Sequence, residues 1–151
     1  MNSYNGFSPA QRTRAQAWLN REWESGRLAR PHVCCACGQS NGIIDAHAED
    51  YSEPFQSGKT DEYHLCFICH MMVHCRFRNH TAWARYRSAV ARGVQFRPYM
   101  RRDFQGFSGL FLRSPELFNQ AKQSATIVAA PCRLVLDEID QSPFAQVRNR
   151  A

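Results

Sequence analysis

Two Cys-x-x-Cys pairs constrain this chain more than any other feature. They are Cys34 with Cys37 and Cys66 with Cys69. Four thiolates are the number that a closed tetrahedral zinc site requires, and paired knuckles of this spacing are a common way to supply them. The spacing therefore predicts a structural Zn²⁺ that joins two distant segments, with Cys35 as an alternative to Cys34 in the first knuckle.

The lack of a membrane span and of a signal peptide predicts a compartment in which thiols stay reduced. No apolar run approaches the roughly 20 residues that a membrane span needs, and residues 1–6 lack the regions of a signal peptide. We therefore expect a cytoplasmic protein without membrane contact, in which thiols bind metal instead of forming disulfides. Cys35, Cys75 and Cys132 fall outside the knuckle spacing, and we expect them to be small buried hydrophobes.

The positive charge is almost entirely arginine and is unevenly distributed. Of 19 basic residues 17 are arginine, the net charge is +6, and no acidic residue lies between Tyr63 and Arg102. Guanidinium groups match phosphate oxygens, so this stretch predicts a nucleic-acid partner. A solvated basic face, or a surface for an acidic protein, is the plainer alternative. The arginines expected to contact phosphates are Arg76, Arg78, Arg85, Arg87 and Arg92.

Caps and breakers predict a mixture of helices and strands. Ser8, Pro9 and Gln11 form a capping box, so we expect a helix from there to about Ser25. Residues 42–47 predict a short strand. The next expected elements are a loop over 51–61, a helix from the second knuckle to about 78, and a basic helix from about 81 to 92.

The C-terminal third carries no readable chemical motif. Ser114 and Pro115 predict a capped helix to about Gln123. Beyond it we expect two strands, or one strand interrupted by a proline, over 126–130 and 133–139, and a loose tail over 141–151. This third is expected to pack on the first part, form a homodimer, or contact a protein partner. The predicted organisation is an N-terminal helix in 1–32, a zinc-held domain with a basic helix in 33–96, and an extension of unknown role in 97–151.

Three groups of residues together resemble the HNH endonuclease family. They are Cys34-x-x-Cys37, Asp45-Ala46-His47 and Cys66-x-x-Cys69-His70-x-x-x-His74. The stretch from His47 to Pro54 is also similar to a subgroup found in phages and mobile elements. The resemblance covers about residues 33–77 and implies an α+β fold: a small ββα-metal core fastened by a four-cysteine zinc site. An N-terminal helix, a basic helix and a C-terminal α/β extension would flank this core.

The resemblance implies roles for the histidines. His47 would be the general base, while Mg²⁺ or Mn²⁺ near His70, His74 and Asp45 would stabilise the leaving oxygen. Positions four apart on a helix share a face, so His70 and His74 can bind one cation. Asp45 shares a strand face with His47, and Asp50 is another candidate ligand. Plainer roles are a His47 hydrogen bond to a backbone carbonyl, or its replacement of a cysteine on zinc.

Two departures from the family pattern leave the activity open. The subgroup has two adjacent histidines, commonly one metal ligand and one base, where this chain has His47 and Ala48; other members have a single histidine after an alanine, as here. The asparagine expected before the second knuckle is absent. The first hypothesis is a metal-dependent DNA endonuclease or nickase from a phage or mobile element. The alternative is an inactive HNH-like zinc protein that binds nucleic acid or blocks a nucleic-acid-handling complex, and a third is a structural zinc module.

Overall fold

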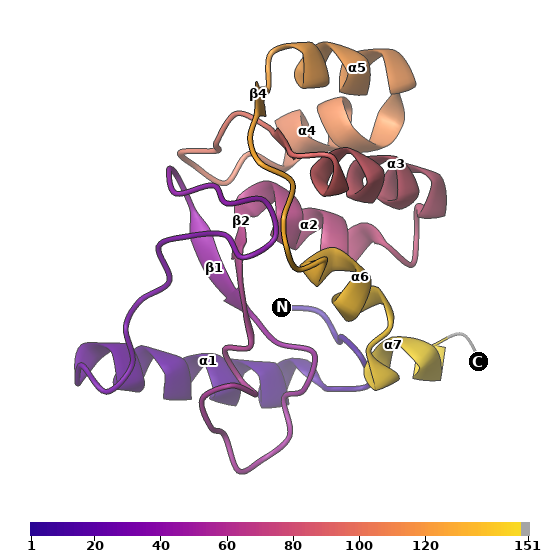
Figure 1. Cartoon of the computed structure of the whole chain (residues 1–151). Helices are drawn as coiled ribbons and strands as arrows, with labels where there is room; N and C mark the ends of the chain where they lie inside the picture. The colour runs from indigo at the N-terminus through magenta and orange to yellow at the C-terminus, as the bar shows by residue number, and fades with distance from the viewer. Residues whose placement is uncertain (149–151) are drawn as a thin grey trace.

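Helix α1 (Pro9–Glu24) begins at the predicted capping box. The Ser8 hydroxyl accepts a hydrogen bond from the Gln11 backbone N–H, and the Gln11 side chain accepts one from the Ser8 N–H. The structure is a computed structural model and describes residues 1–148. Figure 1 shows α1 crossing one end of the molecule, away from α2 to α5. Its place there decides the shape of the pocket described below.

Two short antiparallel strands lead directly into a helix. Strand β1 (Ile44–His47) pairs with β2 (Tyr63–Cys66), and α2 (Phe67–Cys75) starts at the next residue. The register sets Ile44 opposite Cys66 and His47 opposite Tyr63. The strand and the helix predicted here are confirmed, although α2 ends before residue 78. This arrangement brings the end of β1 beside the first turns of α2.

The basic helix forms close to its expected range. Helix α3 (His80–Ala91) starts after Asn79, whose side chain accepts a hydrogen bond from the Ala82 backbone N–H. Gly93 follows with a φ of +87°, and a Cβ there would lie 2.1 Å from the carbonyl oxygen of Val128. Only glycine fits this crossing, which is where β3 (Val94–Gln95) pairs with β4 (Thr126–Ile127).

The chain after β3 packs back on the metal-binding part through aromatic side chains. Helix α4 (Phe104–Phe107) runs into a π-helical segment, η1 (Ser108–Arg113), and α5 (Pro115–Gln123) follows with the predicted Ser114 cap. Phe107, Phe111 and Phe118 from these elements are buried in the same cluster as Cys34, Cys66 and Met72. Of the three roles considered for this third, packing on the first part is therefore confirmed.

The end of the chain is helical where strands and a loose tail were expected. Helix α6 (Val135–Asp140) replaces the predicted second strand, because Val135, Leu136 and Ile139 recur with helical spacing and all three are buried. Helix α7 (Pro143–Arg148) occupies most of the expected tail, and residues 149–151 lie outside the described part. Within residues 1–148, none of the helices is long and apolar enough to cross a bilayer.

Candidate metal centres

The four knuckle cysteines converge as predicted. The sulfur atoms of Cys34, Cys37, Cys66 and Cys69 all lie within 4.8 Å of one another. Cys37 Sγ and Cys66 Sγ are 3.7 Å apart, and a tetrahedral zinc with bonds of about 2.3 Å would separate its sulfurs by about 3.8 Å. The cluster can therefore hold a structural metal such as zinc.

Local structure explains which cysteines take part. Cys34 and Cys37 lie in a tight turn closed by a hydrogen bond from the Gly38 N–H to the Cys34 carbonyl. Cys35 lies in the same turn but is exposed, so it does not replace Cys34. Cys132 is exposed as well, and the expectation that these two thiols are buried is wrong.

The thiols cannot all ionise without a cation. Hydrogen bonds from neighbouring thiols hold the pKa of Cys34 well below its usual range, because they stabilise its thiolate. The interactions with Cys34 and Cys37 raise the pKa of Cys66 and Cys69 well above theirs. One thiolate is therefore easy to form and the others need a positive charge beside them, so metal binding would be coupled to proton release.

A second cluster consists of three histidines. His47 ends β1, and His70 and His74 lie one turn apart on α2; a ring nitrogen of each lies within 4.8 Å of the others. The Nε2 atoms of His70 and His74 are 3.1 Å apart, somewhat less than the roughly 3.4 Å expected for two nitrogens about 2.1 Å from one tetrahedral cation. The structure brings together the three histidines that the sequence singled out.

Each of two carboxylates supports one of these rings from behind. Asp45 Oδ2 lies 3.0 Å from His70 Nδ1, and Glu49 Oε1 lies 2.7 Å from His47 Nε2. An ionised carboxylate only accepts hydrogen bonds, so these nitrogens carry protons and the opposite nitrogens are the ones that can face a metal. Histidines that ligate metals commonly have this support. The cluster therefore offers three imidazole nitrogens to a metal.

The surroundings of His47 suit a metal ligand, and its expected role as the general base stays a prediction. Its side chain is fully buried, and its Nδ1 has no hydrogen-bond partner among the described residues. Burial foremost lowers the pKa of His47 to about 4, so the ring is neutral at pH 7. A neutral, buried and unpartnered nitrogen beside two other imidazoles is suited to binding a cation.

The acidic residues expected as ligands are placed differently. Asp45 does not join the ligand atoms but lies behind His70, where Arg102 also donates two hydrogen bonds to it at 2.9 and 2.6 Å. Burial raises the pKa of Asp45, but the hydrogen bonds from His70 and Arg102 outweigh it and hold the pKa well below its usual range. Asp50 caps its own loop through the Ser52 N–H.

Arg76 is a buried partner of Glu49 and not an exposed phosphate contact. Only 1% of Arg76 and 2% of Glu49 are exposed, and Arg76 Nη2 lies 2.8 Å from Glu49 Oε2. Tyr4 and Asn5 donate further hydrogen bonds to the same carboxylate, both at 2.6 Å. Desolvation raises the pKa of Glu49, yet the His47 hydrogen bond and the charges around it bring the pKa below its ordinary value.

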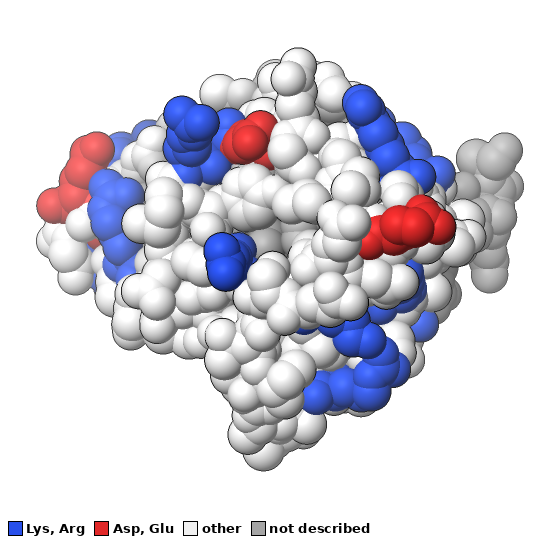
Figure 2. Space-filling view, turned by 90° about the horizontal axis from the view of Figure 1, so that it is seen from above, with Lys and Arg blue, Asp and Glu red and all other residues white. Residues whose placement is uncertain are grey.

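The remaining predicted phosphate contacts divide into two kinds. Arg87 pairs with Asp140 of α6 at 2.7 Å, and Arg85 lies over the Phe118 ring at 4.7 Å, so both tie α3 to the C-terminal third. Arg78 and Arg92 are exposed. On the face drawn in Figure 2, Lys and Arg side chains form several separate groups and no continuous stripe.

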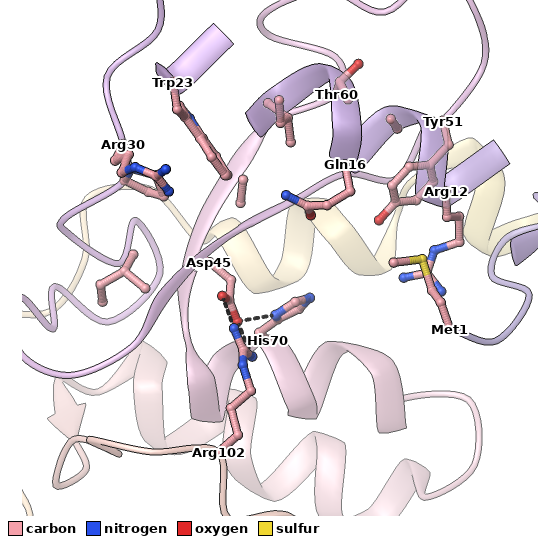
Figure 3. A pocket seen from close by; sticks show the side chains of 15 residues that line it. Met1, Arg12, Gln16, Trp23, Arg30, Asp45, Tyr51, Thr60, His70 and Arg102 are labelled. Carbon is pink, nitrogen blue, oxygen red and sulfur yellow. Dashed lines mark hydrogen bonds and ion pairs between the residues drawn. The ribbon is translucent and has the colours of Figure 1, made fainter. Parts of the chain in front are cut away.

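A pocket of about 460 Å³ opens between α1 and β1. His70 lines it, and Figure 3 shows the His70 ring with Asp45 and Arg102 on the side opposite the α1 residues. His47 and His74 do not line this pocket. The His70 side is thus where the histidine cluster meets this hollow of the surface.

Sequence reasoning missed the residues that surround the histidines. Glu49 had a signal, since it stands two residues after His47, and an extended chain puts such residues on one side. Tyr4, Asn5 and Arg102 had no such signal, because their contacts join positions more than 40 residues apart.

Comparisons with protein-family models, curated proteins and solved structures find no match for the chain.

Proposed function

We propose that this protein is a metal-dependent, HNH-like nuclease that hydrolyses phosphodiester bonds in DNA. The observation that carries the proposal is the cluster of His47, His70 and His74 beside a pocket that contains arginine. The order of β1, antiparallel β2 and α2 supports the resemblance to a ββα-metal core, with the four-cysteine cluster fastening the two knuckles. Nucleic acid as the partner rests on the arginines and on this resemblance.

The donor set favours a different cation from the one the resemblance implies. Mg²⁺ prefers oxygen ligands, whereas imidazole nitrogens suit zinc, nickel and similar ions. His47, His70 and His74 would hold the ion, and Glu49 and Asp45 fix the orientation of two of the rings. A bound divalent cation lowers the pKa of coordinated water and offsets charge on a phosphoryl oxygen.

Arg102 is the residue best placed to hold the scissile phosphate. Its guanidinium is half-exposed, lines the pocket, and pairs with the same Asp45 that contacts His70. Asp45 takes two of the five N–H donors of Arg102, so a phosphate near His70 would meet the N–H groups that remain. Neutral His74, whose pKa burial holds far below its usual range, adds no positive charge of its own.

The absence of a second histidine after His47 favours the binding-only alternative. Ala48 stands there and is buried, so the chain has no base at that position, and His47 is used as a ligand. A positioned general base contributes about 10²- to 10⁴-fold to a rate. We therefore expect slow hydrolysis, and a protein that binds nucleic acid without cleaving it is the second candidate.

Nicking of supercoiled plasmid tests the proposal. Zinc-loaded protein is incubated with and without added Zn²⁺, Ni²⁺, Mn²⁺ or Mg²⁺, beside His74→Ala and the control His32→Ala, which removes a histidine outside the cluster. Metal-dependent nicking that His74→Ala abolishes and His32→Ala keeps supports a nuclease. Folded, zinc-loaded protein that cleaves under none of these metals would leave the binding-only candidate.

A further inference from the structure

We propose that the pocket between α1 and β1 binds a single strand of nucleic acid and excludes a double helix. In this arrangement one base lies on Trp23, one phosphate lies on Arg30, and the strand continues towards Arg12 at the other end of the pocket. The inference rests on the proposed function, because it names the substrate class of the same site.

The side chains that line the pocket form two ends with His70 between them. In Figure 3, Trp23 and Arg30 lie at one end of the pocket and Arg12 and Tyr51 at the other, while His70 lies between the two ends. A chain that runs from end to end would therefore pass His70 with at least one residue on each side. This layout suits a linear polymer cut at an internal bond.

The lining has the chemistry of a nucleotide site. Asp45 is its one acidic residue, and Arg102 and His70 already pair with it, so Arg12 and Arg30 are in excess. The Arg30 guanidinium lies 4.9 Å from the centre of the Trp23 ring. An exposed arginine beside an aromatic face is the combination that binds a phosphate and stacks a base in single-strand sites.

The opposite wall explains why a duplex does not fit. Helix α1 contributes Arg12, Gln16, Leu19 and Trp23 to the lining and faces β1 across the pocket. A space of about 460 Å³ is in the range that holds one small organic ligand, such as a nucleotide or two, and not a double helix with a major groove about 12 Å wide. Paired bases would also have to leave their stack to reach Trp23, at a cost of a few kcal/mol.

Fluorescence anisotropy with labelled oligonucleotides tests the inference. The probes are a 12-nucleotide single strand and a hairpin duplex that contains the same sequence, with zinc-loaded protein at low salt and intact probe verified on a gel. We expect the single strand to bind at least tenfold more tightly. Trp23→Ala should weaken it about tenfold or more, and Trp18→Ala should not, because Trp18 lies on the same helix against Phe55, outside the pocket.

A charge variant at Arg30 tests the phosphate contact. Arg30→Gln should weaken single-strand binding and flatten the salt dependence by about 0.7 in its logarithmic slope, the value of one phosphate contact on a single strand. The control Arg21→Gln removes the same charge from the end of α1, outside the pocket, and should leave the slope unchanged. Equal effects of the two arginine variants would overturn the assignment.

Two results separate this inference from the proposed function. Cleavage of a relaxed duplex circle as fast as a single-stranded circle, or duplex binding as tight as single-strand binding, would overturn the inference and leave the nuclease standing. Preference for the single strand that depends on Trp23 and Arg30 supports the inference, even if no metal gives cleavage and the nuclease proposal fails.

Discussion

Replacing Glu49 with glutamine should strongly destabilise the protein. Oε1 of Glu49 accepts from Tyr4 and His47, and Oε2 accepts from Asn5 and Arg76. A glutamine amide has one oxygen and one NH₂ group, so either orientation turns NH₂ towards two donors. It also removes the counter-charge of a guanidinium that is only 1% exposed.

The magnitude follows from this burial. Removing one partner of a buried ion pair costs about 3–5 kcal/mol, because the other charge stays buried and unpaired. For a chain of this size we expect the midpoint of thermal unfolding to fall by roughly 6–20 °C. The assay is urea and thermal unfolding by circular dichroism at pH 7, with both proteins at the same zinc concentration.

A matched variant separates the effect of burial from the effect of the Glu→Gln change itself. Glu53→Gln makes the same substitution in an ion pair with Arg14, and the Arg14 and Glu53 side chains are 56% and 57% exposed. Exposed pairs of this kind contribute little to stability. If Glu49→Gln unfolds at the same urea concentration as Glu53→Gln, the buried network does not hold the site together and the reasoning is refuted.

Three further predictions follow from the two clusters. Cys66→Ser should lose the structural metal and unfold the central part, and the assay would show zinc release and loss of helical signal. Cys132→Ser, which changes an exposed thiol, should do neither. A folded, metal-free Cys66→Ser protein would contradict this prediction. Asp45→Asn should lower the metal affinity of the histidine cluster about 10- to 100-fold, measured by calorimetry. Asp50→Asn, which alters a loop cap, should leave that affinity unchanged. Equal metal affinities of wild type and Asp45→Asn would exclude a supporting role for Asp45. Because the folded pKa of Glu49 lies below its ordinary 4.5, its stabilisation is present above about pH 4.5 and is lost as the pH falls through the folded value. The gap in unfolding free energy between wild type and Glu49→Gln should therefore shrink between pH 7 and pH 3, and a constant gap would contradict it.

Features with local causes could be predicted from the sequence. The capping box at Ser8 fixes the start of α1, and the four-residue spacing of His70 and His74 on α2 puts both rings on one face. The Cys-x-x-Cys spacing predicts the thiol cluster, because each pair lies within a single turn of chain. In each case the residues that decide the structure are close in sequence.

Features that depend on distant pairing could not be predicted. Arg76 belonged by sequence to an acid-free stretch, and only the fold brings it to Glu49, 27 residues away. Asp45 shares a face with His47 as expected, but Arg102 and His70 turn its carboxylate away from the ligand atoms. The strand expected over 133–139 is a helix instead, although its helical signal, the spacing of Val135, Leu136 and Ile139, is local.

The metal content of the folded protein tests the central claim most directly, namely that the three histidines form a metal centre separate from the four cysteines. Native mass spectrometry after equilibration with zinc should show two ions per chain for the wild type. His74→Ala should retain one ion and His32→Ala should retain two. One ion in the wild type, with no change in His74→Ala, would contradict the account.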